Sequence, residues 1–531
     1  MRGFAKLLIG ASRLRHLAWH PLCFAFFPVL FLATYNAAHI SFTQVMGPLV
    51  VVWILLAGVW LILQRWYRDP HQSGLAVSWF FLLFFLYGHA VDAFSVEFLR
   101  PHRHTYALAA WILLFLAGLW GIRRLSSMKL PLTQGLNGAG ALLLFFTLTH
   151  GMFLSVTTAS EDSSPITIGP SLANEALLHP QSLPDMYYIV LDAYGRADSL
   201  HAIFGYDNTE FLNFLESKGF VVARTSRANY NQTWLALASA LNMAYLNHLV
   251  GKHGLVGDNR KPLKRLIHRN RVVTFLKQLG YTVVSFESGQ SFTDLPTADR
   301  RMPPRPPADE FHLAFWEMTP IPGVLSGVGR LVGTPYSAYQ MHRDRINYAF
   351  DHLADWAGVE TPIFVFAHIL APHPPFVFGP RGEPIDPPRQ YWLGDGSAFM
   401  EKGGTREEYR KRYAGEIEYI NARLKTVIER ILARSPTPPV IILQSDHGSR
   451  LELDWEHLER TNVQETFSIF TAIHFPGGRP TGFYHELSPV NTFRLVFNTV
   501  FGTTFNLLED RSFYSMWTAP YQFQDVTDRL W

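Results

Sequence analysis

Apolar runs dominate the first third of this 531-residue chain. Five apolar stretches lie between residues 21 and 157, separated by short polar links. Each is close to the ~20 residues that an α-helix needs to cross the hydrocarbon core of a bilayer. A single run of this kind could be a buried helix, but five in succession predict a transmembrane domain over residues 1–157. The predicted spans are residues 21–40, 45–64, 75–95, 104–122 and 138–157.

Basic residues predict the orientation of these spans. With a cytoplasmic N-terminus, the inner segments carry nine Lys and Arg residues, whereas the outer links carry only Arg100 and Arg103. The positive-inside rule therefore places the N-terminus in the cytoplasm. The first stretch also lacks a small-residue cleavage site, which argues against a removed signal peptide. Five crossings then place everything after residue 158 on the outer side of the membrane.

Charge and cysteine content exclude several classes of function. A net charge of +3, without a basic cluster interleaved with aromatic residues, argues against nucleic-acid binding. The single cysteine, Cys23, rules out an intramolecular disulfide and a thiolate zinc cluster. Any bound metal must therefore be held by carboxylates, hydroxyls and imidazoles.

The rest of the chain has the pattern of an α/β domain. Residues 158–184 are polar and contain several prolines, which is typical of a linker. Over residues 185–531, short apolar strands alternate with helical patterns, which predicts a mostly parallel sheet covered by helices. The predicted strands are 186–192, 220–223, 281–286, 362–368 and 440–445, the predicted helices are 208–218, 261–279 and 405–434, and the Pro- and Gly-rich segments 296–340 and 374–404 are predicted loops around the mouth of a site.

Three of the predicted strands run into side chains that can bind a metal or a phosphate. They lead to Asp192, to His368 and His373, and to Asp446 and His447. Each has a plain structural interpretation as a turn or cap residue. The carboxyl ends of parallel strands share one edge of a sheet, however, so these side chains are expected to converge there. Two carboxylates with an imidazole suit Zn²⁺ and Mn²⁺ best, and Mg²⁺ also fits.

Thr233 is the best candidate for a hydroxyl brought to such a metal. It follows a polar loop, Asn231-Gln232, and precedes an Ala- and Leu-rich helical pattern. The free N–H groups of a helix N-terminus favour an incoming phosphate. A metal would also activate the hydroxyl as a nucleophile. The alternative interpretation is that Thr233 is simply the N-cap of the helix.

Taken together, these motifs resemble the alkaline phosphatase superfamily. The closest resemblance is to its sulfatase-like, membrane-anchored branch, which includes lipoteichoic acid synthases and lipid A phosphoethanolamine transferases. Those proteins also have five N-terminal spans and an exported catalytic domain. The motifs that carry the resemblance are Tyr188-Ile-Val-Leu-Asp192, Asn231-Gln-Thr233, His368-Ile-Leu-Ala-Pro-His373-Pro-Pro-Phe and Ser445-Asp-His-Gly448.

The resemblance implies roles for these residues. Asp192, Thr233, Asp446 and His447 would bind one metal, with Thr233 as the nucleophile that becomes phosphorylated. His368 and His373 would contact the phosphoryl group, the acceptor or a second metal. The chain departs from the two named transferase groups in having Asp192 where they usually have Glu. It also departs from the phosphoethanolamine enzymes in having no cysteine pair, so the match is to the branch.

The implied function is a metal-dependent transferase at the outer face of a bacterial inner membrane. It would move a phosphoglycerol or phosphoethanolamine group from a phospholipid donor to a glycan or lipid acceptor. The alternative is a phosphatase or phosphodiesterase of the same superfamily, in which water resolves the intermediate. Sulfate ester hydrolysis is disfavoured, because the chain lacks the Cys/Ser-x-Pro-x-Arg pattern that is converted to formylglycine. A non-catalytic membrane protein is disfavoured by the intact Asp/Thr/Asp/His set.

Overall fold

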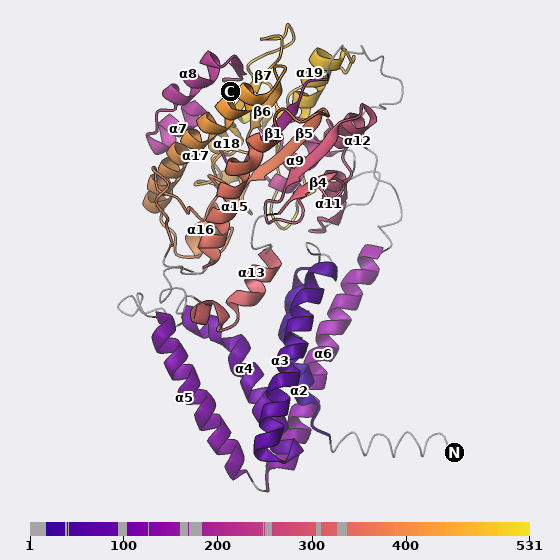
Figure 1. The fold of residues 1–531 in the computed structure, drawn as a ribbon, viewed down its shortest axis with the longest axis vertical. Helices are drawn as coiled ribbons and strands as arrows, with labels where there is room; N and C mark the ends of the chain where they lie inside the picture. Colours follow the sequence, from indigo (N-terminus) through magenta and orange to yellow (C-terminus); the bar gives the residue numbers. More distant parts are fainter. Residues whose placement is uncertain are drawn as a thin grey trace, which may run out of the picture. The chain divides into compact units, whose positions relative to one another are not determined.

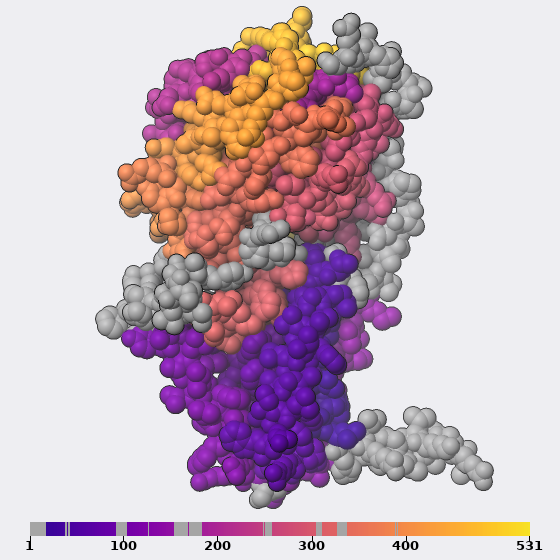
Figure 2. Space-filling model, in the orientation of Figure 1, coloured from indigo at the N-terminus to yellow at the C-terminus, as the bar shows by residue number. Residues whose placement is uncertain are grey.

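The structure is a computed structural model in which the chain forms two units (Figures 1 and 2). One unit comprises Met1–Ser163 and Ala308–Ser337, and the other comprises Ser164–Pro307 and Ala338–Trp531. Most of the predicted linker, 158–184, lies outside the described residues. The residues described are 17–37, 40, 42–93, 103–125, 127–159, 168, 183–247, 249, 257–303, 310–325, 337–387, 389 and 391–530.

The first unit is built from apolar helices that cover the five predicted stretches. Among the described residues, four helices are long and apolar enough to cross a membrane, namely α3 to α6. The helix over the first stretch, α2, has 16 residues and is shorter than the ~20 needed for a crossing. The count of five crossings therefore stays a prediction. The helices are α2 His20–Tyr35, α3 Phe42–Tyr67, α4 Pro70–Ala93, α5 Arg103–Arg124 and α6 Lys129–Ala159.

A short helix from far along the chain belongs to this helical unit. Helix α13, Glu310–Glu317, lies near α4 (Figure 1). It buries Phe311 and Phe315 in the same apolar cluster as Phe85 of α4. The rings of Phe85 and Phe315 lie 6.2 Å apart, and the Gly88 N–H donates to the Met318 carbonyl at 3.1 Å. The prediction of loops throughout 296–340 is wrong here, because one face of α13 is apolar and packs on the helices.

The second unit contains a seven-stranded sheet in the order β2-β7-β6-β1-β5-β3-β4. The five strands from β6 to β4 pair in parallel. At the other edge, β7 is antiparallel to both of its neighbours, β6 and β2. The predicted fold class, a helical membrane domain joined to a mostly parallel α/β domain, is confirmed. The strands are β1 Met186–Leu191, β2 Phe220–Val222, β3 Thr282–Phe286, β4 Arg300–Met302, β5 Ile363–Ile369, β6 Val440–Gln444 and β7 Thr471–His474, with β8 Phe513–Tyr514 and β9 Gln524–Asp525 in a separate pair.

Both faces of this sheet are covered, which explains the continuous apolar strands. In β1, Tyr188 and Val190 face one core cluster, and Ile189 and Leu191 face the other. One face is covered by α9 Thr233–Ala240, α11 Lys261–His268, α12 Arg271–Gln278 and α19 Pro489–Phe501. The other is covered by α7 Ala197–Phe204, α8 Thr209–Ser217, α15 Ala338–His352 and α17 Arg406–Arg434, while α16 Ser397–Glu401 and α18 Val463–Phe467 are short helices in the connections.

The predicted single helix at 261–279 is in fact two helices, α11 and α12. The cause is Asn270, whose extended backbone ends the helical path and whose side chain accepts a hydrogen bond from Val273 N at 2.8 Å. Asparagine at such a position starts a new helix by satisfying a free N–H group. The apolar periodicity continues across this break, so periodicity alone could not reveal it.

The packing of α13 on α4 predicts the effect of a small substitution. A Cβ added at Gly88 would lie 2.0 Å from the Glu317 carbonyl oxygen. Overpacking of this kind costs about 1–3 kcal/mol, so Gly88→Ala should lower the thermal unfolding temperature of the full chain in detergent. Gly121→Ala on α5 is the matched control, since nothing lies within 4 Å of an added Cβ there. Equal unfolding temperatures for the two variants would show that α13 does not pack as described.

Candidate active site

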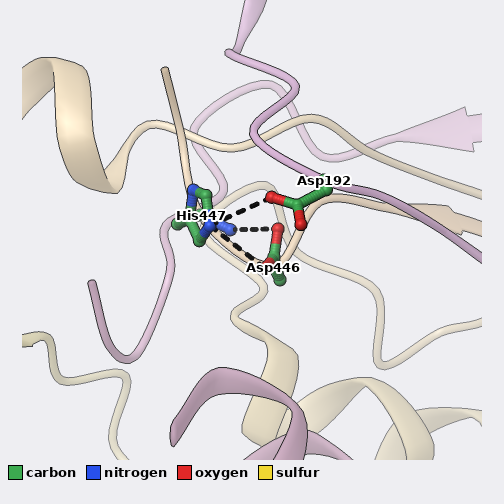
Figure 3. A group of neighbouring side chains, drawn as sticks. All are labelled: Asp192, Asp446 and His447. Carbon is green, nitrogen blue, oxygen red and sulfur yellow. Dashed lines mark hydrogen bonds and ion pairs between the residues drawn. The ribbon is translucent and has the colours of Figure 1, made fainter. Parts of the chain in front are cut away.

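Strand pairing brings three of the predicted residues together. Strand β1 ends just before Asp192, and its parallel neighbour β6 ends two residues before Asp446. Because Val190 pairs with Gln444, the two strands reach the same edge of the sheet in step. Asp192, Asp446 and His447 therefore meet there, and Figure 3 shows their side chains turned toward one another.

The polar atoms of these side chains converge on His447 Nε2. It lies 3.1 Å from Asp446 Oδ2 and 3.2 Å from Asp192 Oδ1. Thr233 Oγ1 completes the group at 3.1 Å from the same nitrogen. Ligand atoms of the two aspartates and the histidine all lie within 4.8 Å of one another, and all three side chains are buried.

The hydrogen bonding of these residues fits a bound cation. The two oxygens that face the cluster, Asp192 Oδ1 and Asp446 Oδ2, are buried without a hydrogen-bond partner. His447 Nδ1 lies 2.9 Å from the Gly448 carbonyl oxygen, which makes it the donor and directs Nε2 to the carboxylates. Unsatisfied buried oxygens of this kind call for a positive partner. The Asp192, Asp446 and His447 group could therefore bind a metal.

Electrostatics keep both carboxyls ionised. Burial raises the pKa of Asp192, but the positive charges of His373 and His447, and the close ring nitrogens of His368 and His447, lower it well below its usual value. Burial and Asp192 raise the pKa of Asp446, yet His447 brings it below its usual value. Burial and Arg450 lower the pKa of His447, but the two aspartates outweigh them and raise it above its usual value. A metal ion would replace this histidine's Nε2 proton as the cation between the carboxylates.

The loop after β1 is held in a strained conformation next to the site. Ala193 has φ 66°, in the left-handed region that disfavours residues other than glycine. Its N–H donates to Asp446 Oδ1 at 3.2 Å, and its carbonyl accepts from the Tyr413 hydroxyl of α17 at 2.7 Å. The Gly195 N–H donates to the same hydroxyl at 2.9 Å. These contacts fix the backbone that carries Asp192.

Thr233 is the first residue of α9, with Gln232 as its N-cap. The alternative that Thr233 is the N-cap is therefore wrong. The preceding loop is tied to Ser515, whose carbonyl accepts from Asn231 Nδ2 at 3.0 Å and whose N–H donates to Asn231 Oδ1 at 2.9 Å. This loop leaves the threonine hydroxyl directed at His447.

Glycine at position 448 is required by space. A Cβ there would lie 2.1 Å from the Glu465 carbonyl oxygen and 2.7 Å from that of Ser468. The Glu465 carboxylate in turn accepts from the Ser449 hydroxyl at 2.8 Å and the Leu451 N–H at 2.7 Å. The chain after His447 is thus pressed against this segment, which fixes the direction of both metal-ligand candidates.

The two histidines after β5's apolar run have different surroundings. His368 lies within β5 itself, with Nε2 3.2 Å from Asp192 Oδ2, and neither ring nitrogen has a hydrogen-bond partner. His373 Nε2 instead lies 3.3 Å from Asp395 Oδ2, and Arg450 Nη1 donates to that same oxygen at 3.0 Å. All the predicted site residues are therefore in one region, with His373 held by a neighbouring ion-pair cluster.

Sequence reasoning missed Asp395 and Arg450. Asp395 lies in the segment 374–404, which was predicted only as loops, and no motif surrounds it. Arg450 follows His447 by three residues, and this closeness to the Asp446-His447-Gly448 motif could have indicated that it lies at the site. The structure identifies both residues because they form a buried charged pair: only 2% of Asp395 and 3% of Arg450 is exposed. Asp and Arg side chains are almost never fully buried unless they are paired.

Replacing one carboxylate tests the metal site. Asp446→Asn should lower metal content per chain, measured by elemental analysis after purification without chelator, because it removes one charge and one strong ligand. We expect metal affinity to fall by roughly 100-fold or more. Asp351→Asn, at a 60% exposed carboxylate on α15, is the matched control and should keep full occupancy. Equal metal content in both variants would contradict the assignment.

The sulfatase family profile matches residues 184–491, which is more than half of the chain. No curated protein matches the sequence. Among solved structures, similarity was found to the periplasmic domain of EptC from Escherichia coli, with 12% identity, 67% of this chain and 96% of that one covered, and a TM-score of 0.42.

Two further solved structures show similar values. Lipooligosaccharide phosphoethanolamine transferase A from Neisseria meningitidis is 13% identical, with 90% of this chain and 94% of that one covered and a TM-score of 0.39. The phosphonate monoester hydrolase of Agrobacterium radiobacter is 15% identical, with 63% and 80% covered and a TM-score of 0.39. The family match confirms the resemblance read from the motifs, and the chain belongs to the sulfatase family of enzymes, within the alkaline phosphatase superfamily.

Proposed function

We propose that this protein is a metal-dependent phosphoryl-group transferase with Thr233 as its nucleophile. The observation that carries the proposal is the position of the Thr233 hydroxyl, 3.1 Å from the same His447 nitrogen that faces the free oxygens of Asp192 and Asp446. A hydroxyl in that position would be a fourth ligand of a metal held by those three side chains. An activated hydroxyl among metal ligands is suited to attack on phosphorus.

The chemistry divides between the metal and the chain. When bound, a divalent ion lowers the pKa of the threonine hydroxyl and neutralises charge on the phosphoryl oxygens. Asp192, Asp446 and His447 would hold it, and the mixed oxygen and nitrogen donors suit Zn²⁺ or Mn²⁺, with Mg²⁺ also possible by donor type. Thr233 Oγ1 forms a bond to phosphorus as the bond to the donor's alcohol breaks. An acceptor hydroxyl then displaces the threonine and restores it.

The identity of the nucleophile argues against sulfate ester hydrolysis within this family. The hydroxyl residue facing His447 is a threonine, and its secondary alcohol cannot be oxidised to the aldehyde that formylglycine requires. The same hydroxyl can carry a phosphoryl group as an ester. The side chains at the site therefore favour phosphorus chemistry over sulfur chemistry.

The membrane helices support a lipid donor. Four described helices are long and apolar enough to span a bilayer. With the fifth predicted span, over residues 21–40, and a cytoplasmic N-terminus, the α/β unit would lie outside. We propose that the donor is a phospholipid of the outer leaflet of a bacterial inner membrane, that a phosphoglycerol or phosphoethanolamine group is transferred, and that diacylglycerol leaves. The acceptor would be the hydroxyl of a glycan or of another lipid.

The proposed nucleophile is tested by substitution. Thr233→Ala should lower turnover roughly 10³-fold or more, because it removes the group that forms the intermediate. Metal content should stay near that of the unchanged chain, since both carboxylates and His447 are kept. Thr233→Ser is the matched control and should retain measurable turnover, because it keeps a hydroxyl at the same position. Full activity of Thr233→Ala would show that the nucleophile is another group.

Mass spectrometry of the Thr233 peptide distinguishes transferase from hydrolase. The full chain is incubated with vesicles of phosphatidylglycerol or phosphatidylethanolamine and then digested. A phosphoglycerol or phosphoethanolamine adduct on Thr233, with diacylglycerol released, is the expected result and names the donor. Rapid release of a soluble phosphate ester into water without an added acceptor would favour the hydrolase.

A further inference from the structure

His373 is held at both of its ring nitrogens by groups that only accept hydrogen bonds. Nδ1 lies 2.5 Å from the Pro374 carbonyl oxygen, and Nε2 lies 3.3 Å from the Asp395 carboxylate. A carbonyl and an ionised carboxylate have no proton to give. An imidazole placed between them carries a proton on each nitrogen, which is the positively charged form. The side chain is buried, so water does not offer either nitrogen another partner.

The charged groups around His373 support this state. They are Asp192 after β1, Asp395, Arg450 after β6, His342 of α15 and Glu416 of α17. Burial lowers the pKa of His373, and Arg450 lowers it further, but Asp192 and Asp395 together raise it to about 9. Burial raises the pKa of Asp395, but Arg450 and His373 bring it to about 2.

Asp395 is itself fixed at both its side chain and its backbone. Arg450 Nη1 donates to its carboxylate at 3.0 Å, and the indole N–H of Trp455 donates to its carbonyl at 3.0 Å. Arg450 Nη2 also donates to the Asn231 carbonyl at 2.7 Å. Asn231 is two residues before Thr233, so one carboxylate is linked both to the histidine and to the loop that presents the threonine.

We propose that Asp395 is a positioning residue of the active site, which keeps His373 as a fixed imidazolium and, through Arg450, holds the Thr233 loop. The proposal rests on the proposed function for its catalytic meaning. His373 and Arg450 bring two positive charges and Asp395 one negative charge, which leaves a net positive charge beside the metal-ligand carboxylates. A phosphodiester anion is the class of substrate that this charge would stabilise.

The task of His373 in this arrangement is to supply positive charge. Both nitrogens of His373 are engaged, so it supplies charge and does not exchange a proton with the leaving group or the acceptor. Asp395→Asn keeps the size of the side chain and an acceptor for Arg450 but removes the negative charge. Without that charge the pKa of His373 should fall by roughly one unit or more.

The first measurement is the pH dependence of kcat/KM for the full chain in detergent, with phosphatidylglycerol or phosphatidylethanolamine as the donor. In Asp395→Asn the alkaline limb should move to lower pH by roughly one unit or more, with turnover at pH 6 affected least. Asp386→Asn is the matched control, because Asp386 lies in the same segment and also pairs with an arginine, Arg343. A limb that moves equally in both variants, or in neither, would overturn the proposal.

A second measurement reads the histidine without turnover. The full chain is labelled with ¹³C at histidine Cε1, and the His373 resonance is assigned by its loss in His373→Gln. The expected result is an imidazolium signal that persists to pH 8. A signal that titrates at or below pH 7 overturns the proposal whatever the activity. If the unchanged chain shows no turnover with either phospholipid, the proposed function fails, and this signal alone decides whether His373 is a fixed cation.

Discussion

The parallel pairing of β1 with β6 and β5 is the interaction on which the site depends. The register carries β1 to the sheet edge in step with β6, so Asp192 meets Asp446 and His447, and it places His368 of β5 beside Asp192. A slip of one residue would turn every side chain of a strand to the opposite face. Burial of both faces of the sheet prevents such a slip, so the packing of the core fixes the geometry of the site.

Buried charge is the second constraint. Asp192 and Asp446 are both buried, and two carboxylates so close together repel unless positive charge lies between them. The imidazolium of His447 can supply that charge, and a bound divalent ion would take the place of its Nε2 proton. The neighbouring cluster of Asp395, His373 and Arg450 has a net positive charge, because it contains two cations and one anion. We infer that the first group serves to hold a metal and the second to hold an anionic substrate near it.

Much of the fold and of the candidate site could be predicted from local sequence patterns. Features that depend on contacts between residues far apart in the sequence could not. The apolar strands and the Asp and His residues that follow them are contiguous in sequence, so a metal-binding group at the strand ends could be predicted. The start of α9 at Thr233 could be predicted because the polar residues before it give way to an Ala- and Leu-rich pattern. Asp395 has no local signature, because its partners lie 22 and 55 residues away along the chain. The packing of α13 on the apolar helices could not be predicted either, since it depends on contacts with residues such as Phe85, more than 200 positions earlier in the chain.

Anomalous diffraction can show whether Asp192, Thr233, Asp446 and His447 surround one metal ion, as we propose. Crystals of the full chain, grown with zinc or manganese, would be measured on both sides of the absorption edge of that metal. We expect an anomalous peak at about 2.0–2.3 Å from one oxygen of each aspartate and from His447 Nε2, with the Thr233 hydroxyl facing it. If metal-replete, active protein shows no anomalous peak among these four residues, they do not form the metal site.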